Sequence, residues 1–93
     1  MIFIIQHTQK EKIEMYRFIL TIRKYFKNTS FTFNQYLQKI ENKNRGTMFK
    51  EMEHNHLIKR TNQHFPARYK LNLEPEDYIF IKKEIALDNL LRG

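Results

Sequence analysis

The stretch that decides the fold is residues 44–72, NRGTMFKEMEHNHLIKRTNQHFPARYKLN. Its first part predicts a short basic helix over residues 44–54. Met48, Phe49 and Met52 recur there at one- and three-residue steps, which places them on one helix face. These three side chains are expected to lie in the core, and the polar positions between them are expected to face outward.

A β-hairpin is predicted directly after this helix. The runs His56–Arg60 and Ala67–Leu71 have strand-like composition, and polar residues 61–66 separate them as a loop. Pro66 favours extended backbone at Phe65 and is therefore expected to end the loop. A helix that runs into a hairpin, with positive charge on both, is a known way of presenting a protein to nucleic acid. The inward strand residues are expected to be Leu57 or Ile58, Tyr69 and Leu71.

The positive charge of the chain is concentrated in this region. The sequence has 17 basic and 10 acidic residues, a net charge of +7. Residues 39–70 contain eight Lys or Arg and three Glu, whereas residues 73–93 contain three basic and five acidic residues. Net positive charge on a small domain favours nucleic acid or an anionic membrane surface as partner. Its localisation is what a binding face would require.

Two helices and a short strand are predicted before this stretch. Apolar residues at three- and four-residue steps predict a first helix from about Thr8 to Lys27, with Thr8 and Glu11 as a capping box. A short strand is expected at Ser30–Thr32. A second helix is expected over 33–40, where Thr32 and Gln35 form a second capping box.

A final helix is predicted from Pro75 to Leu90 or Leu91. Pro suits the first helical position, and acidic residues follow it in the first turn. Apolar residues occupy more than one stripe of this helix. It is therefore expected either to pack against two parts of the domain or to contact a partner. Residues 1–93 are expected to form a single domain, with residues 1–7 as an apolar arm that covers core surface or exchanges with a second copy.

The predicted order of elements is helix, strand, helix, helix, strand, loop, strand, helix. With the run from Phe49 through Met52 to Arg60 and the return strand Arg68–Leu71, this order resembles the winged helix-turn-helix superfamily of DNA-binding domains. The resemblance covers about residues 8–90. It implies a mainly α fold with a small β-hairpin, of class α+β and order α-β-α-α-β-β-α. It also implies that helix 44–54 enters the major groove while the wing, residues 59–70, contacts the backbone or minor groove.

One residue departs from the pattern of that superfamily. His56 stands where a glycine with left-handed backbone is usual. Asn55 adopts that conformation more readily than most residues, so the turn could instead shift by one position.

The candidate base contacts lie at the start of the predicted third helix. Lys43 and Arg45 are placed where base edges are normally approached, and Arg can pair with guanine through two hydrogen bonds. Thr47 and Lys50 are candidates for base or phosphate contact. Asn44 could read adenine or cap the helix.

The hairpin is expected to bind phosphates. Such contacts add affinity and salt dependence without sequence information. His64 could touch a phosphate or a groove, or be an idle surface residue, and Tyr36 is either a core residue or a phosphate donor. The expected phosphate contacts are Lys59, Arg60, Arg68 and Lys70.

Several other functions have no support in the sequence. The chain has no Cys and therefore no disulfide or Cys-based zinc site. His54 and His56 could share a strand face, but no third metal ligand is evident, so neither a metal nor another cofactor is expected. No nucleophile–base pair or carboxylate dyad has a recognisable spacing, which argues against an enzyme. No apolar run approaches about 18 residues, so no membrane span is expected.

The sequence thus favours a sequence-specific double-stranded DNA-binding protein, a cytoplasmic transcriptional regulator. It is expected to act as a homodimer through helix 75–91 together with the first helix. The alternative is a winged-helix interaction or single-strand-binding subunit of a replication or mobile-element complex, whose apolar last helix would dock a larger subunit.

Overall fold

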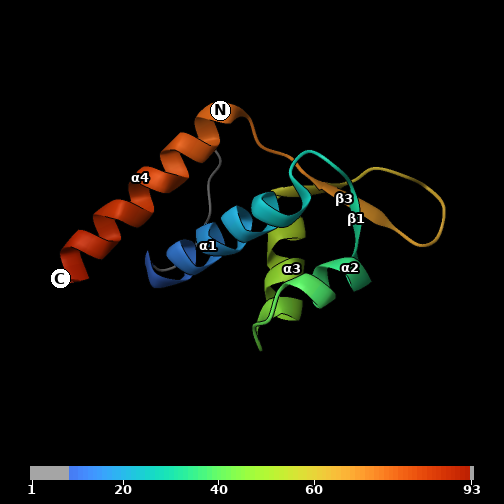
Figure 1. Ribbon diagram of the computed structural model, residues 1–93, viewed down its shortest axis with the longest axis horizontal. Coiled ribbons are helices and arrows are strands. Elements are labelled where there is room, and N and C mark those ends of the chain that lie inside the picture. Colours follow the sequence, from blue (N-terminus) through green and yellow to red (C-terminus); the bar gives the residue numbers. More distant parts are fainter. Residues whose placement is uncertain (1–8, 93) are drawn as a thin grey trace.

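The computed structural model describes residues 9–92, which form a mainly helical fold with a small three-stranded antiparallel sheet (Figure 1). The predicted α+β class and the predicted order of elements are confirmed. The principal extents are 45 × 29 × 23 Å. The elements are α1 (Gln9–Phe26), β1 (Phe31–Thr32), α2 (Phe33–Lys39), α3 (Arg45–His54), β2 (Ile58–Arg60), β3 (Arg68–Leu71) and α4 (Pro75–Arg92).

Helix α1 lies at the centre of the fold, in contact with α4, α3 and β3. Its apolar residues recur every three or four positions, so one broad face is apolar; Ile19 and Ile22 on that face are fully buried. Helix α4 runs alongside α1 (Figure 1). The Arg23 guanidinium of α1 lies 3.8 Å from the centroid of the Tyr78 ring of α4, a cation–π contact.

Helix α4 begins at the predicted residue, Pro75, and its first turn is fixed by a buried carboxylate. Asp77 is only 1% exposed, and its Oδ2 accepts a hydrogen bond of 2.8 Å from the backbone N–H of Glu74. This bond satisfies an N–H group that the helix itself cannot pair. Tyr78 and Ile81 are buried on the same side, against α1.

The predicted capping box of α2 is confirmed. The Thr32 hydroxyl accepts from the Gln35 N–H at 3.1 Å, and the Gln35 side chain accepts from the Thr32 N–H at 2.9 Å. Tyr36 is fully buried, and its ring lies 5.0 Å from that of Phe49 on α3. Phe49 in turn meets Tyr69 of β3 edge-on at 4.9 Å. An aromatic cluster therefore joins α2, α3 and the sheet.

The sheet has the strand order β1-β3-β2, with every neighbouring pair antiparallel. Ile58 pairs with Leu71, and both are buried in the core. The expectation that Leu57 or Ile58 faces inward holds for both residues. The loop 61–67 joins β2 to β3, and its Phe65–Pro66 peptide bond is cis.

The turn between α3 and β2 has left-handed backbone at His56, where φ is 60°. Asn55 has a φ of −89°, so the turn does not shift to it. The Leu57 N–H donates to the Met52 carbonyl and the His56 N–H to the Glu53 carbonyl, which is the Schellman pattern of helix ends. Because His56 and Leu57 complete the helix end, β2 starts at Ile58 and not at the predicted His56.

Two expectations lie outside the described residues, namely the apolar arm 1–7 and the cap at Thr8. Within residues 9–92, no helix is sufficiently long and apolar to cross a membrane.

Candidate nucleic-acid interface

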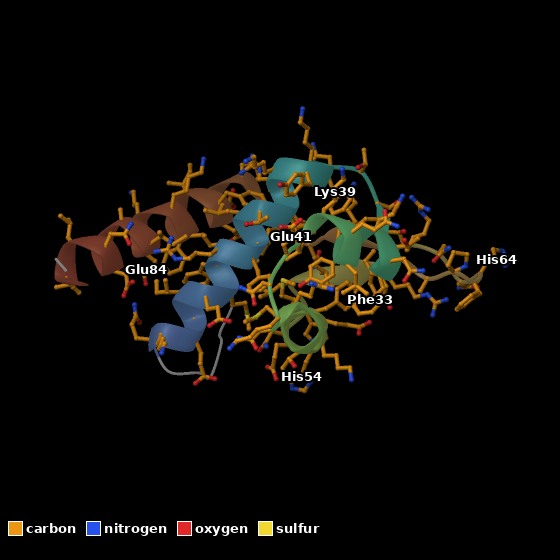
Figure 2. The ribbon with its side chains drawn as sticks, turned by 60° about the horizontal axis from the view of Figure 1, so that its bottom comes forward. Phe33, Lys39, Glu41, His54, His64 and Glu84 are labelled. Carbon is orange, nitrogen blue, oxygen red and sulfur yellow. The ribbon has the colours of Figure 1, made fainter. Side chains whose placement is uncertain are left out.

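Helix α3 has one face in the core and the opposite face in solvent. Phe49 and Met52 are buried and Met48 is partly buried, as predicted. Thr47, Lys50 and His54 are exposed at spacings of three and four residues, so they form a single outward stripe. We call these three residues the α3 stripe. Figure 2 shows His54 pointing away from the body of the molecule.

Lys43 lies just before the stripe and is exposed. It also lines an open groove between α1 and residues 41–44. Three basic and three acidic side chains line that groove, so it has no excess of positive charge and is not an anion pocket. The charged residues that line the groove are Lys10, Arg17, Lys43, Glu14, Glu41 and Asp88.

The N-terminus of α3 is organised differently from the sequence expectation. Asn44 occupies the cap position but makes no capping hydrogen bond; its Nδ2 lies 3.4 Å from Oε1 of Glu14 on α1. Asn42 instead accepts from the Asn44 N–H at 2.8 Å, closing the turn before the helix. The prediction that the Asn44 side chain caps α3 is therefore wrong, because its amide group is turned toward α1.

Arg45 does not belong to the α3 stripe. It is half-buried, and its carbonyl accepts a hydrogen bond of 2.7 Å from the Tyr36 hydroxyl. Burial raises the pKa of Tyr36, and the positive charge of Arg45 acts in the opposite direction. The core interpretation of Tyr36 is confirmed, and its hydroxyl serves to fix the start of α3 against α2.

Gly46 lies beside the α3 stripe, and no neighbouring atom of the protein would clash with a larger residue's Cβ at this position. A Cβ added at this residue would meet no atom within 4 Å. A helical glycine costs about 1 kcal/mol relative to alanine. The open space would allow a close approach of the backbone by an external partner.

The basic residues of the hairpin lie on both faces of the sheet. Lys59 pairs directly with Lys70. Tyr69, next to Lys70, packs on Phe49 of α3, and successive strand residues alternate between faces, so both lysines project from the face opposite α3. Like charges placed directly opposite each other destabilise a strand pair. Nearby anions would relieve that repulsion.

Arg68 and Arg60 both make hydrogen bonds within the protein. The Arg68 guanidinium donates from Nε to the Ser30 hydroxyl at 3.0 Å and from Nη2 to the Ser30 carbonyl at 3.3 Å. Arg68 is half-buried, so its first role is to hold the segment before β1. Arg60 is exposed and donates to the His64 carbonyl at 3.3 Å, which links β2 to the tip of the loop.

The tip of the loop 61–67 carries two exposed aromatic side chains, His64 and Phe65. His64 projects at the outer end of the hairpin (Figure 2). Phe65 is 95% exposed, more than any other large apolar side chain among the described residues.

The predicted contacts therefore separate into three groups. Lys43, Thr47 and Lys50 gather at α3, and Arg60 and His64 gather at the loop. Lys59, Lys70 and the Ser30-bound Arg68 lie along the sheet. Outside these groups, the Asn44 side chain is turned toward α1, and Arg45 is half-buried.

Sequence reasoning overlooked two residues of this surface, His54 and Phe65. His54 was considered only as a metal ligand, yet its spacing of four from Lys50 already predicts that the two share a helix face. Phe65 was considered only for its backbone, and no sequence signal indicates its exposure. From the sequence, Gly46 fits either the early turn of the helix or a close approach of the backbone to a phosphate, and only the structure shows the empty space around it. Among the described residues, no group of three His, Asp or Glu side chains converges to hold a metal ion.

Comparison of the chain with protein-family models, curated proteins and solved structures gives no match.

Proposed function

We propose that the protein is a winged-helix protein that binds double-stranded DNA, with the α3 stripe in the major groove and the loop 61–67 against the backbone or minor groove. The observation that carries this proposal is the α3 stripe itself. Thr47, Lys50 and His54 are exposed on a helix whose other face is held by the aromatic cluster. A rigid helix with an outward row of hydrogen-bonding side chains fits the major groove in width and chemistry.

The charge distribution supports a polyanionic partner for this part of the chain. The sequence has no acidic residue between Glu53 and Glu74, while four Lys or Arg fall within that span. Lys50 and Arg60 lie on the two surfaces that would face the DNA. Lys59 and Lys70, on the other sheet face, would add longer-range attraction.

We further propose that the protein is a transcriptional regulator that binds its site as a homodimer. The exposed face of α4 carries five large apolar side chains, and the positions of four of them are symmetric about residue 85. An antiparallel copy of α4 would set Ile79 opposite Leu91 and Phe80 opposite Leu90. Such self-complementarity is what a two-fold interface requires. The exposed apolar residues of α4 are Ile79, Phe80, Leu87, Leu90 and Leu91.

The test of DNA binding is a fluorescence-anisotropy titration of labelled duplexes from the genome that encodes the chain, repeated over a range of salt concentrations. We expect tight binding to a minority of fragments and a linear fall of log affinity with log salt. Lys50→Ala should weaken binding to the preferred fragments by about 1–3 kcal/mol if Lys50 pairs with a base. Lys82→Ala on α4 is the matched control, since it removes one exposed charge away from the proposed surface.

Two outcomes would contradict the proposal. Absence of binding to any duplex at low salt would exclude DNA as the partner. Equal weak binding to every fragment would exclude sequence recognition and would favour the alternative of a subunit in a replication or mobile-element complex.

A further inference from the structure

Phe65, in the loop 61–67, buries almost none of its side chain within the fold. Burial of a phenylalanine side chain contributes favourable free energy to folding. Phe65 is 95% exposed, so almost none of that free energy contributes to this fold. The two other exposed phenylalanine rings among the described residues do contribute: Phe33 contacts Phe49 at 4.8 Å, and Phe80 contacts Tyr16 at 6.2 Å between ring centroids.

Hydrogen bonds fix the loop that carries this ring. Asn62 donates from Nδ2 to the Pro66 carbonyl at 3.1 Å and accepts from the Arg68 N–H at 2.9 Å. The Thr61 N–H donates to the Arg68 carbonyl at 2.8 Å, and Arg60 donates to the His64 carbonyl. Both ends of segment 63–66 are thereby tied to the strands. The ring of Phe65 is presented by an ordered tip.

The surroundings of Phe65 are basic as well as exposed. His64 precedes it in the loop, Arg60 at the end of β2 donates to the His64 carbonyl, and the whole hairpin lacks acidic side chains. A partner must therefore combine negative charge with a flat apolar surface that accepts an aromatic ring. Stacked bases between phosphate backbones have this combination, and apolar side chains are known to wedge between base steps from the minor groove.

We propose that Phe65 is a base-stacking wedge, which inserts between neighbouring bases of a duplex while Arg60 and His64 contact the flanking phosphates. This inference rests on the proposed DNA binding and adds a defined contact to it. Stacking of one base on an aromatic side chain is worth about 1–3 kcal/mol, so its loss would lower affinity by about 5- to 150-fold. Insertion would also kink the duplex, most readily at flexible pyrimidine–purine steps.

The chain contains no Trp, which makes a direct optical test feasible. Phe65→Trp would carry the only indole of the protein, and stacking on bases should quench its fluorescence when a mixed-sequence duplex is added at low salt. Lys82→Trp is the matched control, because it places the only indole at an exposed position of α4, away from the hairpin and outside the five apolar residues of that helix. Heparin serves as a polyanion without bases, and it should bind without quenching Phe65→Trp.

Affinity measurements complete the test. Phe65→Ala should bind the same duplex more weakly within the fold range given above, while Gln63→Ala, an exposed neighbour in the same loop, should bind as the wild type does. Unchanged affinity of Phe65→Ala together with no quenching of bound Phe65→Trp would overturn the wedge and leave DNA binding intact. Quenching by heparin equal to that by DNA would also overturn it. If the wild-type protein binds no duplex, the proposed function fails and the wedge fails with it.

Discussion

At the scale of single residues, His56 has a backbone conformation that its side chain disfavours. Left-handed backbone costs a residue with a Cβ about 1–2 kcal/mol, although His tolerates it better than most. Glycine at this position of a Schellman turn has no such cost. We therefore expect His56→Gly to stabilise the protein by about 1 kcal/mol, which for a domain of this size raises Tm by about 4–8 °C. Thermal unfolding followed by circular dichroism would measure the change.

The neighbouring residue gives the matched control. Asn55 has a negative φ of −89°, and its Nδ2 donates to the Glu51 carbonyl at 2.7 Å. Asn55→Gly relieves no strain and removes a hydrogen bond, so it should lower Tm. A rise in Tm with Asn55→Gly, or a fall with His56→Gly, would contradict the assignment of the strained residue.

At the scale of elements, a substitution at Gly46 should change the stability of α3 and its proposed affinity for DNA in opposite directions. Gly46→Ala should stabilise the helix by up to about 1 kcal/mol, because the added Cβ meets no atom of the protein. If DNA approaches the α3 stripe closely, the same methyl group should reduce affinity for duplexes. A variant with raised Tm and weakened DNA binding is the expected result. A raised Tm with unchanged affinity for DNA would indicate that DNA does not closely approach this side of α3.

The exposed face of α4 makes a second prediction at this scale. Leu90 is 78% exposed, so Leu90→Glu should leave the fold intact and convert a dimer into a monomer in analytical ultracentrifugation. Lys82→Glu, exposed at the flank of the apolar face, should remain dimeric. If the wild-type protein is a monomer, the homodimer proposal is wrong, and the apolar face of α4 would be left for a different partner.

The elements were predictable because their signals are local, whereas the candidate site depends on long-range contacts. The capping box of Thr32 and Gln35 spans four residues, and Pro75 marks the start of α4 directly. In contrast, Arg68 binds Ser30, 38 positions earlier in the chain, and no pattern within one strand predicts that an arginine expected on phosphate is held this way. The hydrogen bond from the Tyr36 hydroxyl to the Arg45 carbonyl likewise depends on how α2 and α3 pack.

At the scale of the whole molecule, four tyrosines should make the free energy of unfolding depend on pH in the alkaline range. Burial is the main cause that raises the pKa of Tyr16, Tyr36, Tyr69 and Tyr78 above the ordinary value of 10.0. Above that pH the unfolded chain loses these phenolic protons first, so unfolding is favoured. The stabilisation is complete below pH 10 and decreases as pH rises beyond it.

Tyr36 should contribute the clearest part of this dependence, because it is fully buried and its hydroxyl must keep a proton to donate to the Arg45 carbonyl. Urea unfolding from neutral pH to about one unit above the ordinary tyrosine pKa would measure it, with a loss approaching about 1.4 kcal/mol per pH unit for each such tyrosine. Tyr36→Phe should be less stable near neutral pH by about 0.5–1.5 kcal/mol, since the hydrogen bond is lost. It should also lose stability less steeply above pH 10 than the wild type, and lysine titration cancels in that comparison. Parallel pH profiles for the two proteins would contradict a buried, proton-holding Tyr36.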